Sequence, residues 1–162
     1  MTVDGTHCPI QETRPFSKKW SSHKLGKKAG LNYEIGIQIS QSRVVWVNGP
    51  FPASLNDLTV FREKGLKEAL PTGKRCMGDE GYTHEETIST RNDFDPTELA
   101  MFKWRALSRH ETFNSRLKSF HCLKSKFCHG ITKHKVAFEA VCLILIYEME
   151  NGSPLLDPYP WF

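Results

Sequence analysis

The sequence predicts one domain of the α/β class, in which a mixed sheet is flanked by helices. Apolar stretches in the first half indicate strands, and two long apolar periodicities in the second half indicate helices. A hairpin followed by crossover helices gives a mixed sheet with helices packed on it. The length of 162 residues fits a single domain that buries about two-thirds of its unfolded surface.

The first half of the chain is expected to supply the central strands. Residues 2–10 are strand-like, whereas residues 11–30 are rich in Pro, Ser and Lys and predict a loop. Residues 33–39 alternate apolar and polar side chains, which is the period of a half-buried strand. After a polar turn, residues 44–47 form a continuous apolar strand. The pair therefore predicts a hairpin, which Gly49-Pro50-Phe51-Pro52 should end.

Shorter elements should follow the hairpin. Ser54 and Asp57 have the spacing of a helix capping box, and apolar residues at helical spacing come after them. A Pro-Thr-Gly sequence should end this helix. Residues 75–78 then predict a strand, and residues 87–90 are ambiguous but fit a short edge strand.

Two long helices should fill the second half. Asp95-Pro96 begins the first, since proline suits the first turn and Glu98 favours the positive end of the helix dipole. After a break at His129-Gly130, the second runs from about His134 to Glu150. Its apolar run is too short to span a membrane and predicts a buried helix. The buried stripe of the first long helix is expected to consist of Leu99, Phe102, Ala106, Phe113, Leu117 and Phe120.

Residues 1–152 are therefore expected to form the domain, and residues 153–162 a tail that holds three prolines and three aromatic residues. We expect this tail to be a docking strap or an extended arm. Only three residues precede Asp4, where a central strand should already be under way, so we expect the domain to be truncated at its N-terminus.

The net charge of +4 is unevenly distributed. Residues 103–135 hold nine Lys or Arg and one acid, and residues 14–28 hold six Lys or Arg and none. Between them, residues 79–98 hold seven acids against Arg91 alone. A single short run of charge is as often a solvated face as a binding surface. Two basic segments around an acidic one better suit a polyanion that approaches a metal site.

The five cysteines are an odd number, widely spaced, and no signal peptide precedes them. This pattern favours free thiols in a reducing, intracellular compartment. Cys122 and Cys128, with histidines at 121, 129 and 134, invite a zinc interpretation. Zinc-binding cysteine pairs are usually separated by two to four residues and followed by a second pair, so buried thiols and surface histidines explain this segment better.

Three carboxylates occupy positions that a fold of this kind would bring together. Asp4 and Asp79 each follow a strand-like stretch, and Glu111 lies on the polar, basic face of the long helix, which also carries Asn114 and Lys118. Taken singly, an Asp before Gly is usually a turn residue and a helix Glu usually faces solvent. Taken together, three carboxylates can hold two divalent ions about 4 Å apart, which is a site for phosphodiester chemistry.

Four blocks carry a resemblance to a known family. They look like successive parts of the DDE endonuclease domain of PIF/Harbinger-type transposases and their domesticated relatives, in the family's order, over about Val3 to Glu150. The blocks are Asp4-Gly5-Thr6-His7, Gly49-Pro50-Phe51-Pro52-Ala53-Ser54 with Asp57, Gly78-Asp79-Glu80-Gly81-Tyr82, and Arg109-His110-Glu111-Thr112-Phe113-Asn114 with Leu117-Lys118.

The resemblance implies an RNase H-like fold and a divalent-metal cofactor, Mg²⁺ or Mn²⁺. It also implies DNA cleavage and strand transfer, in which water and later a 3′-hydroxyl attack the phosphodiester. Asp4, Asp79 and Glu111 would be the metal-binding catalytic triad. Asp57 matches an acid outside the triad, and we interpret it as a helix-start residue near the site.

DNA is the partner that this resemblance and the basic segments indicate, with an intracellular, nuclear location. Non-specific, salt-sensitive phosphate contacts are expected from Arg105, Arg109, Arg116, Lys118, Lys124 and Lys126. Family transposases commonly carry an N-terminal helix-turn-helix region, for which this chain has no room. A separate DNA-binding protein would then supply target recognition, and an oligomer is compatible with the sequence. The alternative function is a domesticated, non-catalytic module that binds nucleic acid or protein.

Overall fold

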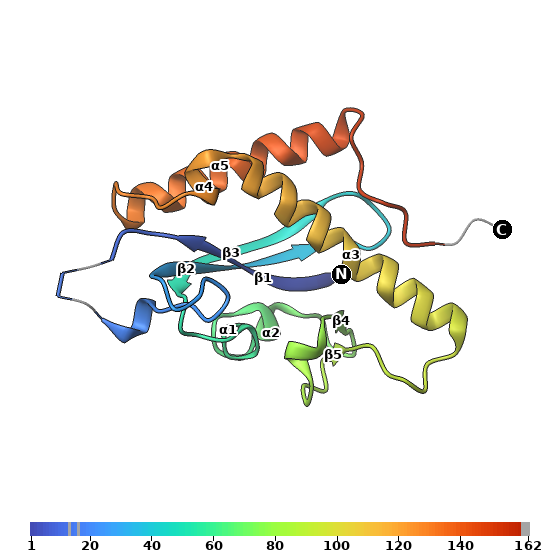
Figure 1. Ribbon diagram of the computed structural model, residues 1–162. Helices are drawn as coiled ribbons and strands as arrows, with labels where there is room; N and C mark the ends of the chain where they lie inside the picture. Colours follow the sequence, from blue (N-terminus) through green and yellow to red (C-terminus); the bar gives the residue numbers. More distant parts are fainter. Residues whose placement is uncertain (13, 16, 160–162) are drawn as a thin grey trace.

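The computed structural model describes residues 1–12, 14–15 and 17–159. Figure 1 shows an α/β domain, which confirms the predicted fold class. The elements in chain order are β1 (Thr2–Pro9), the 3-10 turn η1 (Lys18–Trp20), β2 (Gly30–Ile37), β3 (Val44–Pro52), α1 (Asp57–Glu63), α2 (Leu66–Ala69), β4 (Cys76–Met77), the 3-10 turn η2 (Glu80–Tyr82), β5 (Ile88–Ser89), α3 (Thr97–Ser119), α4 (His121–Lys124) and α5 (Ile131–Glu150).

The five strands of the described residues form one mixed sheet in the order β3-β2-β1-β4-β5. β1, β2 and β3 form antiparallel pairs, whereas β1 pairs with β4, and β4 with β5, in parallel. The predicted hairpin and the short edge strand are both confirmed. A long antiparallel meander followed by short parallel strands is consistent with the RNase H-like sheet expected from the sequence.

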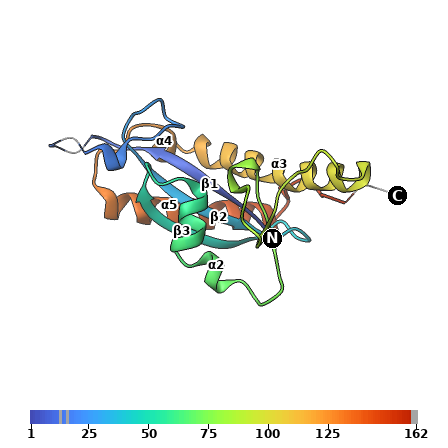
Figure 2. The ribbon, with the colours of Figure 1, turned by 90° about the horizontal axis from the view of Figure 1, so that it is seen from below.

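Helices cover both faces of this sheet (Figures 1 and 2). α3, α4 and α5 lie on one face, and α1 and α2 lie on the other. The first face buries the larger core, where the Tyr33 ring stacks on Phe138 with centroids 3.7 Å apart and its hydroxyl lies 2.8 Å from Nδ1 of His134. The second core joins Val3 of β1 to Phe61 of α1.

The second strand of the hairpin is longer than predicted. β3 continues through Gly49-Pro50-Phe51-Pro52, and its last two residues pair with Leu31 and Asn32 after a bulge. Proline donates no backbone hydrogen bond, so it is tolerated here because β3 is an edge strand. The prediction that this sequence ends the strand is therefore wrong.

The helix after the hairpin also differs from the prediction. Asn56, not Ser54, is the N-cap, and its side chain accepts a hydrogen bond from the Thr59 amide at 2.7 Å. The capping-box interpretation fails because the Asp57 carboxylate is bound elsewhere, to Lys24 and Asn32. The expected single helix is split into α1 and α2 at Gly65, whose φ of 104° is unfavourable for other residues.

The long helix α3 is confirmed, but only part of its predicted apolar stripe is core. Ala106, Phe113 and Leu117 are fully buried, whereas Leu99 is 41% exposed. The first turns of α3 extend beyond the sheet, as Figure 1 shows, so they have no strand beneath them. Phe102 packs there against Tyr159, with ring centroids 5.4 Å apart.

The final helix is not the buried helix that the sequence predicts. One face of α5 packs on the sheet through Phe138, Val141 and Leu145. The opposite face leaves large apolar side chains in solvent, because no other described element covers it. Its most exposed members are Val136, Leu143, Ile144 and Tyr147.

The described part of the tail, residues 153–159, is docked on the domain. Leu155 is buried, and its amide donates to the Ser42 hydroxyl at 2.8 Å. Arg116 donates to the carbonyl oxygens of Ser153 and Pro154. Residues 160–162, which complete the predicted tail, lie outside the described residues.

The five cysteines are free thiols, as predicted. His134 is buried against Tyr33, so the interpretation of the histidines near Cys128 as surface residues is wrong for this one. None of the helices in the described ranges combines the length and apolarity that a membrane crossing needs.

Arg109 ties α3 to the turn between β2 and β3. Its side chain is only 1% exposed, and its guanidinium donates to the carbonyl oxygens of Ile39 and Gln41. Removing a buried donor leaves its acceptors without partners, which is costlier than losing an exposed hydrogen bond.

We expect Arg109→Met to lower the free energy of unfolding by about 2 kcal/mol, because two backbone carbonyls lose their donor while the side-chain volume is nearly kept. The exposed Arg43→Met is the matched control and should change it by less than about 0.5 kcal/mol. Urea unfolding monitored by circular dichroism measures both, and equal losses would contradict the role given to Arg109.

Candidate active site

Asp4 is placed by the alternation of side chains along β1. Thr2, Asp4 and Cys8 turn to the face covered by α3, where they contact His110, Asn114 and Lys118 respectively. Val3 and Gly5 turn to the opposite face, where Val3 joins the second core. The carboxylate of Asp4 is therefore directed toward α3, half-buried at the edge of the larger core.

Asp79 reaches the same region through the parallel pairing of β1 with β4. Thr2 is paired with Met77, and the Met77 amide donates to the carbonyl of Met1 at 3.0 Å. Asp4 lies two residues after Thr2 within β1, and Asp79 lies two residues after Met77, just past the end of β4, so this pairing places them at the same level. The chain then turns away, because Asp79 becomes the N-cap of η2 and accepts from the Gly81 amide at 2.9 Å.

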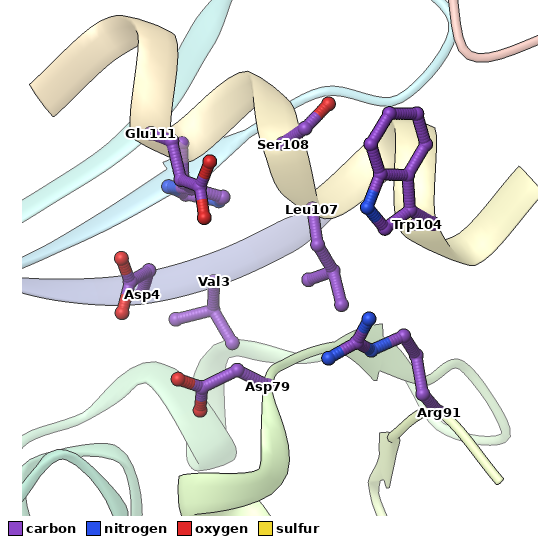
Figure 3. A pocket seen from close by; sticks show the side chains of 9 residues that line it. Val3, Asp4, Asp79, Arg91, Trp104, Leu107, Ser108 and Glu111 are labelled. Carbon is purple, nitrogen blue, oxygen red and sulfur yellow. The ribbon is translucent and has the colours of Figure 1, made fainter. Parts of the chain in front are cut away.

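Glu111 comes from α3, which lies against β1 along a polar seam. Nε2 of His110 is 2.8 Å from the Thr2 hydroxyl, and the Asn114 amide donates to Oδ2 of Asp4 at 3.3 Å. These two contacts flank Glu111 on the helix. Glu111 itself is exposed, and its carboxylate extends from the helix toward Asp4 (Figure 3).

The three predicted carboxylates line one cavity of about 230 Å³. Asp4 comes from β1, Asp79 from the end of β4 and Glu111 from α3, although 107 residues separate the first from the last along the chain. Figure 3 shows the three side chains around the same space. The structure thus brings together the side chains that the sequence singled out.

Asp4 holds its proton more tightly than an ordinary aspartate. Burial raises the pKa of Asp4 from 3.8 to about 6, against the opposing charge of Lys24 and with the repulsion of Asp57 and Asp79 added. The Gly5 amide, which donates to Oδ1 of Asp4 at 2.7 Å, lowers it slightly. Neighbouring carboxylates repel one another, and this repulsion adds to the rise in the pKa of Asp4.

A partly exposed ion pair, in which Asp57 is the more buried partner, lies behind Asp4 on the other face of β1. Asp57 accepts from Lys24 at 2.8 Å and from the Asn32 amide at 3.0 Å. Gly5 makes this packing possible, because a Cβ there would sit 1.9 Å from Oδ1 of Asp57. Burial lowers the pKa of Lys24, but the attraction of Asp57, with Asp4 and Asp79, raises it overall. Asp57 is therefore a helix-start residue near the site, as interpreted from the sequence, and it does not line the cavity.

Two residues that line the cavity were not assigned to the site from the sequence. Arg91 points its guanidinium into it (Figure 3), and lies 3.5 Å from Glu80. The sequence feature that could have identified Arg91 is that it is the single Lys or Arg among the acids of residues 79–98. Trp104 of α3 also lines the cavity and is 55% exposed. Nothing in the sequence indicated that Lys24 lies near Asp4, because it belongs to a loop without periodicity.

The donor set fits a hard divalent cation, since Mg²⁺ and Mn²⁺ prefer carboxylate oxygens. Asp4, Asp79 and Glu111 supply these from three elements around one cavity. Within the described part of the chain, no three His, Cys, Asp or Glu side chains yet stand close enough to hold a metal ion. Asp79 and Glu111 are both exposed.

Four of the six cations predicted to contact DNA phosphates are engaged within the domain. Arg109 is buried, so its guanidinium does not reach the surface. Arg105 donates to the Asp157 carbonyl and Arg116 to the tail. Lys118 donates to the carbonyl of His7 at 2.6 Å. These side chains hold α3, β1 and the tail together.

The other two predicted cations lie on an open basic groove. Lys124 and Lys126 are exposed and line a cavity of about 840 Å³ beside the far end of β1. Arg14 and Lys28 line the same groove, and Glu12 is the acid among its lining residues. Pro9 at this groove lies five positions after Asp4 along β1, a span of about 17 Å.

A family model described as DDE superfamily endonuclease matches residues 3–146 of the chain. The match contains Asp4, Asp79 and Glu111, and it ends inside α5. Searches of the curated proteins and of the solved structures found no match.

The raised pKa of Asp4 predicts a pH-dependent stability. The folded protein keeps this proton up to about pH 6, whereas the unfolded chain loses it near 3.8. The stability that the protonated form contributes is therefore full below pH 4 and lost as the pH rises through 6. Between pH 4 and 7, the free energy of unfolding of the metal-free wild type should therefore fall by about 1–2 kcal/mol relative to that of Asp4→Asn.

Urea unfolding of both proteins in EDTA at several pH values measures this difference. Burial raises the pKa of Glu34 to about 7, but Glu34 is present in both proteins, so its contribution to the pH dependence cancels in the difference. A difference in stability that stays constant across this range would contradict the environment described for Asp4.

Proposed function

The chain belongs to the DDE superfamily endonuclease family, and from that premise we propose that it is a metal-dependent DNA endonuclease with a transposase-type site. The single observation that carries this proposal is the shared cavity of Asp4, Asp79 and Glu111. The motif blocks point further to the PIF/Harbinger type. The reaction is then phosphodiester hydrolysis, followed by attack of the released 3′-hydroxyl on a phosphodiester of a second DNA strand, whose own 3′-oxygen leaves as the new P–O bond forms.

Asp4, Asp79 and Glu111 would hold the cofactor, Mg²⁺ or Mn²⁺. The bound ions would supply an activated water and stabilise the charge on the leaving oxygen. Asp4 gives up its proton for this purpose, so cation binding should strengthen as the pH rises toward 6. The Gly5 amide and the Asn114 amide hold its two oxygens in place.

Arg91 and Trp104 suit the substrate side of the cavity. A guanidinium that points into a site lined by carboxylates can bind a phosphate flanking the scissile one. The exposed indole of Trp104 offers a surface on which an unpaired base can stack. These two residues would position the strand, while the carboxylates carry the chemistry.

We place the flanking DNA along β1, from the cavity to the basic groove. The span of about 17 Å corresponds to about five base pairs of duplex DNA. Lys124 and Lys126 remain the phosphate contacts that we propose from the predicted set, now joined by Arg14 and Lys28. Backbone contacts of this kind give affinity without sequence recognition, so a separate DNA-binding protein would direct the enzyme to its target.

A non-catalytic module that binds nucleic acid or protein is the second candidate. The observation that favours it is the open arrangement of the carboxylates, which do not yet form a metal-binding group in the described residues. This candidate would bind DNA through the basic groove with no dependence on Mg²⁺.

Calorimetric titration with Mn²⁺ separates the two candidates. The wild type should bind Mn²⁺, and Asp79→Asn should weaken binding at least about tenfold because one carboxylate ligand is lost. Asparagine keeps the cap on η2, so the variant should stay folded. Asp93→Asn, an exposed acid outside the cavity, should bind like the wild type.

The same comparison applies to heat stability, since a ligand that binds only the folded state raises Tm. Loss of binding in Asp79→Asn alone would justify a DNA cleavage assay. A folded wild type that binds no Mn²⁺ would favour the non-catalytic module. Equal binding by the Asp79 and Asp93 variants would defeat the site assignment.

Salt dependence tests the basic groove. Replacing Lys124 and Lys126 together by Glu should weaken duplex DNA binding and reduce the slope of log K against log salt by about 2, one for each lost phosphate contact. The control replaces Lys74 and Arg75, an exposed pair before β4, in the same way. Fluorescence anisotropy measures both, and identical slopes would remove the groove from the DNA path.

A further inference from the structure

The outer face of α5 carries a continuous apolar stripe. Val136, Leu143 and Tyr147 are 62%, 66% and 68% exposed, and Ile144 is 45% exposed. With Ala140, which is also exposed, they recur at the three- and four-residue spacing that places side chains on one side of a helix. The stripe runs along most of the helix, and no described part of this chain covers it.

Charged residues at the two ends of this stripe have opposite signs. Lys133 and Lys135 lie at its N-terminal end, and Glu148 and Glu150 lie at its C-terminal end. All four are exposed. Lys135 is 3.8 Å from Glu139 on the same helix, whereas no ion pair within the described residues involves Lys133, Glu148 or Glu150.

Two copies of α5 that run in opposite directions have complementary charges at their ends. If a second α5 lies antiparallel on the first, with a two-fold axis near residues 141–142, each basic end meets an acidic end. The helical repeat of 3.6 residues puts Lys133 on the same flank as Glu148 of the other helix, and Lys135 on the same flank as Glu150. A parallel arrangement would instead bring lysine against lysine and glutamate against glutamate.

The apolar residues follow the same symmetry. Around that axis Val136 lies opposite Tyr147 of the other helix, and Ala140 lies opposite Leu143. A small residue opposite a large one at the centre lets two helices approach to the usual 8–10 Å between axes. An interface in which one patch meets its own copy is the arrangement that two-fold symmetric dimers use.

We propose that α5 is the interface of a homodimer, in which two copies of this chain pair their outer α5 faces antiparallel. The occupant of the apolar stripe is thus a second copy of this chain, selected by the reversed charges at its ends. α5 lies on the side of the sheet that carries α3 (Figure 1), and no residue of its apolar stripe lines the carboxylate cavity or the basic groove.

Sedimentation equilibrium of the full chain tests this proposal. The wild type should be dimeric in a concentration-dependent manner below about 100 µM, the range in which a micromolar Kd is measurable. Leu143→Glu places one carboxylate of each copy at the centre of the apolar stripe. It should weaken dimerisation at least about tenfold. Leu99→Glu, at an exposed leucine of α3, is the matched control and should leave the dimer unchanged.

Charge reversal tests the antiparallel arrangement. One variant replaces Lys133 and Lys135 by Glu, and the other replaces Glu148 and Glu150 by Lys. Each alone should dimerise several-fold more weakly than the wild type, because both ends of its stripe then carry one sign. An equimolar mixture of the two should recover the dimer as a heterodimer.

A wild type that stays monomeric at about 100 µM would overturn the proposal and leave the stripe to a different protein. A dimer that Leu143→Glu does not weaken would overturn it as well, because the interface would then lie elsewhere. Circular dichroism of each variant should show the wild-type helix content, since all the replaced side chains are exposed. These readouts do not involve metal or DNA, so they are independent of the proposed function.

Discussion

The polar seam between α3 and β1 is the constraint on which the site depends. His110, Asn114 and Lys118 contact Thr2, Asp4 and Cys8 at successive turns of the helix, and each contact pairs a residue near the start of the chain with one more than a hundred positions later. Thr2, Cys8 and His110 are buried, so leaving their polar groups without partners would be costly. The seam therefore fixes both the angle of α3 and the position of Glu111 relative to Asp4.

Contacts within the domain explain why the basic residues on α3 do not form a simple phosphate-binding face. Arg105 and Arg116 hold the tail, Arg109 holds the β2–β3 turn, and Lys118 holds β1. Their donors are directed at backbone carbonyls, which helix and sheet ladders leave unpaired at turns and ends. The cations that remain available to a polyanion lie further along, at the end of β1 and after α4.

The cavity balances repulsion among its acids against nearby cations. Burial and neighbouring carboxylates raise the pKa of Asp4, while Lys24, held by Asp57 across the strand, opposes that shift. Arg91 adds a second positive charge on the open side. The attraction of Lys24 and the repulsion of the neighbouring acids therefore act on Asp4 together.

The sequence by itself determined the strand pattern, the long helices and the three carboxylates, because side-chain periodicity and local motifs are properties of neighbouring residues. It failed at Asn56, which caps α1 because Asp57 is bound by Lys24 and Asn32, and at Arg109, which is buried by a turn some 70 residues away. Only the tertiary structure decided which cations are free, that Arg91 faces the cavity and that one side of α5 is uncovered. All three features depend on contacts between segments that are distant in the sequence. Periodicity along the chain indicates whether a face is apolar, but it does not indicate what packs against that face.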